Sequence, residues 1–324
     1  MKVHTCFWVN RLFQSVRPTT EAIDRSNDET TCEYVSSRGL LKSCDCRSVV
    51  PVSSQKRVET TAFSGLDDGD MVYVCSSALR DFADKWLRKI DKRVILLSGD
   101  SDTPVPTGAL SDAAFKALVE CDKVIAWFSQ NLVLSPKRHP KLRHLPIGLD
   151  YHTLSEKSLY WGPVASPRAQ EELLMGVARN ADPFFDRIPK AYTTFHFELS
   201  RGGRRLAYEH IPSELVSYEP ARVSRLTSWE NQSRYAFVVS PPGEGLDCHR
   251  TWEALSLGCI PILISTPLDD MYEGLPVLIV KSWADLSREL LDSTLREYKT
   301  RKFSMEKMKL QYWLDAIRSC YPKR

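Results

Sequence analysis

The 324-residue sequence lacks the long apolar runs and the cysteine spacing that mark membrane and disulfide-rich proteins. No stretch approaches 18 consecutive apolar residues, so we expect no membrane span. The first residues, MKVHTCFWVNRLFQ, are interrupted by polar side chains and make a poor signal peptide. The nine cysteines are odd in number and scattered, which favours buried thiols in a reducing compartment over a disulfide framework. We therefore expect a soluble, cytoplasmic protein.

Strong charge of one sign and a metal-binding cluster are lacking as well. The net charge is +3, from 44 basic and 41 acidic residues, and does not indicate a nucleic-acid partner. The basic run RGGRR at 201–205 is interpreted as a solvated loop. Cys44 and Cys46 are too close for half of an ordinary zinc site, and no His or Cys cluster completes them. We expect no metal site.

What the sequence does contain is two series of alternating strand and helix patterns. Residues 1–65 have no sustained period and predict a loosely ordered tail. Alternation over 66–155 and again over 180–295 predicts a parallel sheet with crossover helices in each part. Residues 156–179 connect the two, and residues 296–324 are helical in pattern and expected to cross back to the first domain. The predicted fold class is α/β, with two Rossmann-like domains facing each other across a cleft.

The segment SPPGEGLDCHRTWEALSLGCIPILI, residues 240–264, places a glycine turn between a buried strand and a helix. Such a turn directs backbone N–H groups and the positive end of the helix dipole at one point, which suits a phosphate or diphosphate. It is not a P-loop, because no Gly-Lys-Ser/Thr follows, and its spacing differs from the dinucleotide fingerprint. We predict a nucleotide site here that includes Ser240, Gly243, Gly245 and Asp247.

Helical geometry sorts the side chains that follow the turn. At about 100° per residue, one narrow face, expected to pack on the sheet, collects Cys248, Trp252, Leu255 and Cys259. Arg250 and Glu253 lie roughly opposite this face and can look into the cleft, the cation toward a diphosphate and the carboxylate toward ribose hydroxyls. The alternative is a surface ion pair at i, i+3, worth about 0.3 kcal/mol.

The same segment, with LPVLIVKSWADL after it, resembles the donor-nucleotide half of the exostosin-like glycosyltransferases. The resemblance is to the branch of ribitol xylosyltransferases and related algal and chlorella-virus xylosyltransferase-like enzymes, and extends more weakly to KAYTTFHFELSRGGRR and HPKLRHLPIGLDYHTL. It implies a GT-B fold, a nucleotide-sugar donor and no required metal or other cofactor. By the matching motif it also implies that Arg250 binds the diphosphate and Glu253 the ribose.

The resemblance further implies transfer of xylose or a similar sugar, expected to be UDP-linked, to a hydroxyl of a glycan or glycoprotein acceptor. Two features depart from the family. Cellular relatives carry an N-terminal membrane anchor that this sequence lacks, which puts residence in the Golgi in doubt. Glu244 also places a negative charge within the glycine turn.

An inverting transfer needs a base for the acceptor hydroxyl, expected from the first domain at the carboxyl end of a strand. VILLSGDSDTPVP places Asp100 and Asp102 there as catalytic candidates, although both could simply cap the loop or the next helix. Asp150 and His152 lie near the presumed hinge and come next. His196 could touch the leaving phosphate, but a core histidine is the favoured interpretation.

Two other functions remain open at this stage. In metal-dependent GT-A transferases an Asp-x-Asp holds Mn²⁺ and the donor diphosphate, and Asp100-Ser101-Asp102 has that form. The two alternating series argue against it. The other alternative is an inactive relative that binds a sugar nucleotide or glycan without turnover, because a fold alone does not establish activity.

Overall fold

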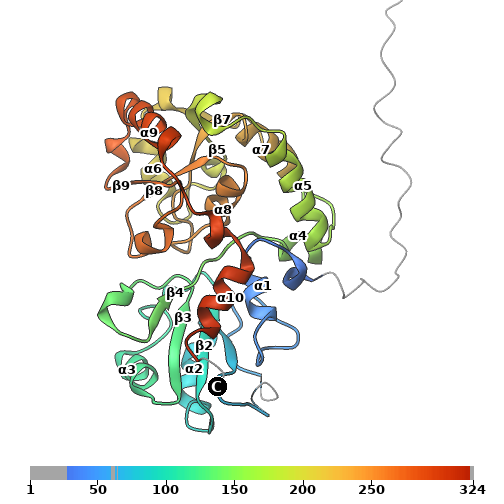
Figure 1. The fold of residues 1–324 in the computed structure, drawn as a ribbon, viewed down its shortest axis with the longest axis vertical. Coiled ribbons are helices and arrows are strands. Elements are labelled where there is room, and N and C mark those ends of the chain that lie inside the picture. Colours follow the sequence, from blue (N-terminus) through green and yellow to red (C-terminus); the bar gives the residue numbers. More distant parts are fainter. Residues whose placement is uncertain (1–27, 60–62, 64, 322–324) are drawn as a thin grey trace, which may run out of the picture.

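The chain folds into two α/β domains, each built on one parallel sheet (Figure 1). The computed structural model describes residues 28–59, 63 and 65–321. Strands follow the order β1-β2-β3-β4 in the first sheet and β6-β5-β7-β8-β9 in the second, and all neighbouring pairs are parallel. The predicted fold class, α/β with two Rossmann-like domains in the GT-B manner, is confirmed.

The first sheet is made of short apolar runs that are buried on both faces, as parallel strands require. Its strands are β1 (Met71–Cys75), β2 (Val94–Gly99), β3 (Val124–Ser129) and β4 (Leu142–His144). The crossover helices are α2 (Leu79–Lys85) and α3 (Asp112–Glu120). Ser111 is the N-cap of α3, because its side chain accepts a hydrogen bond from the backbone N–H of Ala114.

The second sheet has a reversal in strand order that locates a binding crevice. Its strands are β5 (Ile188–Thr193), β6 (Val216–Tyr218), β7 (Tyr235–Val239), β8 (Ile260–Ile264) and β9 (Leu278–Val280). Its helices are α6 (Arg204–His210), α7 (Arg225–Gln232), α8 (His249–Ser256) and α9 (Arg288–Thr300). The order reverses between β5 and β7, and ligands of such sheets bind outside the carboxyl ends of the strands at this switch point.

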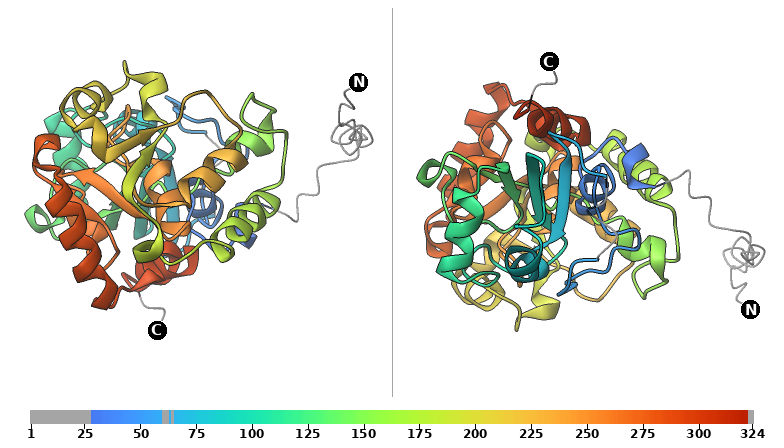
Figure 2. Two further views of the ribbon diagram at one scale, coloured as in Figure 1. Left: turned by 90° about the horizontal axis from the view of Figure 1, so that it is seen from above. Right: turned by 90° about the horizontal axis from the view of Figure 1, so that it is seen from below.

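Helices of the connector and of the C-terminal segment join the two domains. The connector carries α4 (His152–Glu156) and α5 (Pro167–Arg179), and the chain ends in α10 (Leu310–Arg318). In all views α10 lies beside the first domain, next to α1 (Ser37–Lys42) (Figures 1 and 2). The C-terminal segment therefore does cross back, but the crossing begins after α9, which packs on the second sheet.

The prediction of a loosely ordered tail is wrong for residues 28–59, which belong to the folded body. Leu40 is fully buried, in an apolar cluster that also contains Trp252 of the second domain and Trp313 of α10. The carboxylate of Glu171 accepts hydrogen bonds from two backbone N–H groups of this segment. The sequence did not reveal this order because α1 is six residues long, too short to show a period. Residues 1–27 lie outside the described residues.

Across the described ranges, none of the helices combines the length and the apolar character needed to cross a membrane.

Leu40→Ala should lower the free energy of unfolding by about 2–5 kcal/mol, because it leaves a cavity in a core shared by both domains. Val50→Ala is the matched control in the same segment, since Val50 is 70% exposed, and it should change stability by less than about 0.5 kcal/mol. Urea denaturation followed by tryptophan fluorescence measures both. Equal, small effects would mean that the segment adds nothing to the fold.

Candidate functional site

A cleft of about 570 Å³ lies between the two domains, at the switch point of the second sheet. Asp102, Asp150 and His152 line it from the first-domain side, and Arg250 and Glu253 line it from α8. The glycine turn after β7 forms part of the same wall. The predicted nucleotide segment and the predicted catalytic side of the molecule therefore do meet in one cavity.

The glycine turn is held between two other loops that leave no room for side chains. A Cβ at Gly202 would lie 1.8 Å from the carbonyl oxygen of Gly243, and Gly202 has a φ of +49°. A Cβ at Gly245 would lie 2.8 Å from the side chain of Asn131, which belongs to the first domain. Glycine at these positions lets three chain segments converge on the cleft.

The RGGRR run is not a solvated loop along its whole length, so that interpretation is wrong. Arg201 and Arg204 line the cleft. The Arg204 guanidinium lies 3.4 Å from where a Cβ of Gly243 would stand. Burial, together with the nearby Arg250 and Arg201, lowers the pKa of Arg204. Arg205 does behave as predicted, with a side chain that is 65% exposed beside Glu209, and Arg201 is exposed where it lines the cleft. The weak family resemblance across this run was the one signal of its role.

Helix α8 has the two faces that the sequence predicts. Trp252 and Leu255 are buried against the core, while Arg250 and Glu253 reach the cleft. The alternative of an Arg250–Glu253 surface pair does not hold: Glu253 Oε1 instead lies 3.7 Å from a guanidinium nitrogen of Arg225. Among the described carboxylates, none forms an ion pair with Arg250. Its charge is therefore available to a ligand.

Two residues of the predicted nucleotide site serve the fold instead. Asp247 is buried, and its carboxylate accepts hydrogen bonds from the backbone N–H of Ile147 at 2.8 Å, Trp252 Nε1 at 2.9 Å and Tyr272 Oη at 2.8 Å. Burial raises the pKa of this carboxyl. The Ser240 hydroxyl is buried against the hydroxyl of Thr251. Both side chains form hydrogen bonds with internal partners, and of the two only Asp247 is among the residues that line the cleft.

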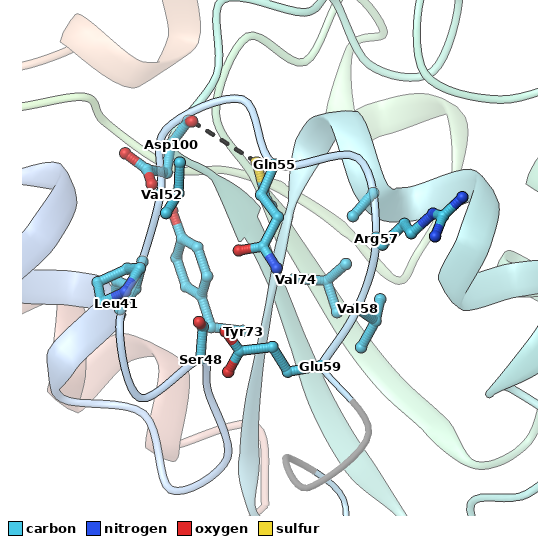
Figure 3. Close-up of a pocket in the computed structure, with 13 residues that line it drawn as sticks. Leu41, Ser48, Val52, Gln55, Arg57, Val58, Glu59, Tyr73, Val74 and Asp100 are labelled. Atoms are coloured by element: carbon cyan, nitrogen blue, oxygen red, sulfur yellow. Dashed lines mark hydrogen bonds between the residues drawn. The ribbon is translucent and has the colours of Figure 1, made fainter.

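The predicted catalytic aspartates point into different cavities. Asp100, 7% exposed, lies under the loop 48–59 (Figure 3). Its Oδ1 is 3.2 Å from Arg38 Nε and accepts a hydrogen bond from Ser53 Oγ at 2.9 Å. Asp102 lines the interdomain cleft. Asp100 has a φ of +55°, and this left-handed residue turns the chain so that the two carboxylates separate. Asp100 is therefore absent from the cleft lining, and of the two predicted aspartates Asp102 is the one that the cleft presents to a ligand.

Asp150 and His152, the next candidates named from the sequence, form a cluster in the cleft with Arg225, which the sequence did not single out. Arg225 donates hydrogen bonds to the Asp150 carbonyl and carboxylate at 2.7 and 3.0 Å, and its guanidinium lies 4.2 Å from the Trp161 ring. Asp150 Oδ1 is in turn 3.2 Å from His152 Nδ1. Burial opposes the charge of Asp150, but His249, Arg225 and His152 hold its pKa well below the usual range.

Burial also lowers the pKa of His152, against the opposing effect of Asp150. The imidazole is therefore neutral at neutral pH, with Nδ1 lying 3.2 Å from Asp150 Oδ1. His249, 6.4 Å away between ring centroids, donates from Nδ1 to the carbonyl of Gly148 at 2.7 Å. His196 lies outside the cleft lining and bonds through Nε2–H to the Glu219 carbonyl, as a packed histidine does.

Comparison with known proteins adds little to this geometry. No protein-family model matches the chain, and no curated protein does. One similar solved structure is described as trehalose-6-phosphate from E. coli bound with UDP-2-fluoro glucose. It is 12% identical, with a TM-score of 0.33, and the match covers 79% of this chain and 71% of that one. A likeness at this level carries no argument, and the exostosin-like resemblance stays a prediction.

Arg204→Ala and Arg250→Ala should each weaken nucleoside-diphosphate binding by about 1.5–3 kcal/mol, the range for hydrogen bonds to charged groups. Arg205→Ala is the matched control, because Arg205 is the adjacent arginine and does not line the cleft. Titration calorimetry with UDP and GDP measures all three. Equal losses of affinity in Arg204→Ala and Arg205→Ala would mean that the loss reflects only the net positive charge of the surface. Unchanged affinity in Arg250→Ala would mean that Arg250 is not part of the binding site.

Proposed function

We propose that the protein transfers a sugar from a nucleotide-diphosphate sugar to a hydroxyl group of a glycan or glycoprotein. The observation that carries this proposal is the set of three arginines around the glycine turn: Arg201, Arg204 and Arg250. None of them forms an ion pair with any carboxylate in the described part of the chain. They lie at the switch point of a parallel sheet, where such folds bind nucleotides.

The remaining parts of the second-domain wall fit the same ligand. The first turn of α8 directs backbone N–H groups and the positive end of its dipole toward the turn, which favours a diphosphate. Glu253 is one turn further along the same helix face and is steadied by Arg225, so it can accept hydrogen bonds from ribose hydroxyls. Because of the family resemblance, UDP-xylose is the first donor to test.

We also propose that transfer needs no bound metal, because the arginines can stabilise the charge that develops on the departing diphosphate. In the GT-A alternative, Asp100 and Asp102 would act together to hold Mn²⁺ and the donor diphosphate. Asp100 is tied to Arg38 and Ser53 under the loop 48–59, away from the cleft that Asp102 lines. Within the described residues, no group of three or more His, Cys, Asp or Glu side chains could hold a metal ion.

Two groups on the first-domain wall can serve as the base. Asp102 is the one predicted from the sequence, and in the part of the chain that the structure describes no hydrogen bond orients its carboxylate. His152 is oriented by Asp150, which is itself fixed by Arg225. The nearby carboxylate stabilises the imidazolium that forms when the neutral ring accepts a proton at Nε2. We assign the base to His152.

The reaction then balances without a further reactant. The acceptor O–H gives its proton to His152 Nε2, and the acceptor oxygen forms a bond to the anomeric carbon of the sugar. The bond between that carbon and the β-phosphate oxygen breaks, and its electron pair leaves with the diphosphate, which the arginines hold. Attack from the face opposite the leaving group inverts the configuration of the sugar.

The wild-type protein should release UDP from a UDP-sugar slowly in the absence of acceptor, and should do so equally well after exhaustive chelation. Coupled assays for the released nucleoside diphosphate, run with donors that differ in sugar and in nucleobase, measure this. Loss of activity on chelation with recovery by Mn²⁺ would support the GT-A alternative. Tight nucleotide binding with no turnover for any donor or acceptor glycan would instead identify a binding protein.

His152→Gln should lower kcat by about 10²–10⁴-fold, the usual contribution of a positioned base, with little change in UDP affinity. A histidine accepts a proton only when it is neutral. Wild-type turnover should therefore be high at neutral pH and fall as the pH drops through the lowered pKa of His152. Asp102→Asn is the comparison. A lower kcat in Asp102→Asn, with a normal kcat in His152→Gln, would mean that Asp102 is the base.

A further inference from the structure

A second hollow, of about 180 Å³, opens beside the cations of the cleft on the second domain. It shares four lining residues with the cleft: Thr194, Arg204, Ser228 and Arg250. Its outer part is formed by Tyr160 of the connector, by Phe197 and by Arg222. Of the described residues that line this hollow, none belongs to the first domain. The hollow is therefore an extension of the arginine cluster away from the proposed base.

The planar side chains of this hollow are fixed in place. The Arg222 guanidinium lies 5.5 Å from the Tyr160 ring centroid and 5.3 Å from that of Phe197. It donates hydrogen bonds to Tyr160 Oη at 2.9 Å, to the Phe197 carbonyl at 3.0 Å and to Glu198 Oε1 at 2.8 Å. The Tyr160 ring is nevertheless 67% exposed. These hydrogen bonds and ring contacts orient the Arg222 guanidinium, and together Tyr160, Phe197 and Arg222 form an exposed platform.

We propose that this platform binds the nucleobase of a nucleoside diphosphate by stacking, an inference that rests on the function proposed above. The groups of a nucleotide sugar follow one another as base, ribose, diphosphate and sugar. The sugar must face the first-domain wall, where His152 and Asp102 lie, and the diphosphate belongs at the arginines. The base then falls on the far side of the arginines, and the hollow lies there. Aromatic rings and arginine planes are the groups on which bases stack.

Aromatic platforms also bind sugars, so the ligand set must separate base from glycan and from phosphate. UDP, GDP and inorganic pyrophosphate are titrated into the wild type, Tyr160→Ala and Arg222→Lys. Arg222→Lys keeps the charge and removes the planar group. For the nucleotide that the wild type prefers, both variants should raise Kd by about 5-fold to 100-fold, the range for the loss of one stacked base. The Kd for pyrophosphate should not change.

Tyr208→Ala is the matched control: Tyr208 is an exposed tyrosine of the same domain that packs on Tyr218 and does not line the hollow. It should leave every Kd unchanged. Unaltered nucleotide affinity in both platform variants would overturn the proposal, as would equal losses for nucleotide and pyrophosphate. A raised KM for acceptor glycan alone would assign the hollow to the acceptor. If the wild type bound neither pyrophosphate nor any nucleotide, the proposed function itself would fail. That result is distinct from unaltered nucleotide affinity in the platform variants, which would overturn only the stacking proposal.

Discussion

The buried carboxylate of Asp247 is the interaction on which the geometry of the cleft depends. One charged group accepts hydrogen bonds from the hinge backbone at Ile147, from Trp252 on α8 and from Tyr272 beyond β8. It ties the first-domain wall to the start of the helix that carries Arg250 and Glu253. A buried carboxylate is costly unless its oxygens accept hydrogen bonds, and removing one of these donors would leave the carboxylate less well satisfied. Asp247 therefore helps to fix the relative position of the two sides of the cleft, together with the Asp150–Arg225 and Gly148–His249 contacts.

Around that point, three chain segments converge that are distant in the sequence. The turn after β5 brings Arg201 and Arg204, the turn after β7 brings the glycines, and Asn131 reaches across from the first domain. The reversal of strand order between β5 and β7 leaves the space in which they meet. Asn131 accepts a hydrogen bond from the backbone N–H of Asp247 at 3.2 Å, so the first domain also braces the nucleotide turn. Fold topology and close glycine packing together produce the concentration of positive charge.

The sequence predicts those parts of this site that depend on local periodicity. The opposite faces of α8 follow from 100° per residue, so Arg250 and Glu253 were placed correctly in the cleft. Arg225 was not foreseen, because its partners lie far along the chain and no local pattern records them. The separation of Asp100 from Asp102 depends on one left-handed residue, which the sequence gives no means of recognising. Site features that depend on one backbone dihedral angle, or on ion pairs between residues distant in the sequence, therefore cannot be predicted from the sequence alone.

The crowding of Arg201, Arg204 and Arg250 has a consequence for the protein without its ligand. Like charges held this close repel one another, and the lowered pKa of Arg204 reflects that repulsion together with burial. This repulsion lowers the free energy of unfolding, and a multivalent anion bound among the three arginines would offset it. If a nucleoside diphosphate binds here as proposed, phosphate or sulfate in a buffer would compete with it weakly and would raise the melting temperature by mass action. In such a buffer the protein would be more stable, and the measured affinity for the proposed nucleotide ligand would be too low.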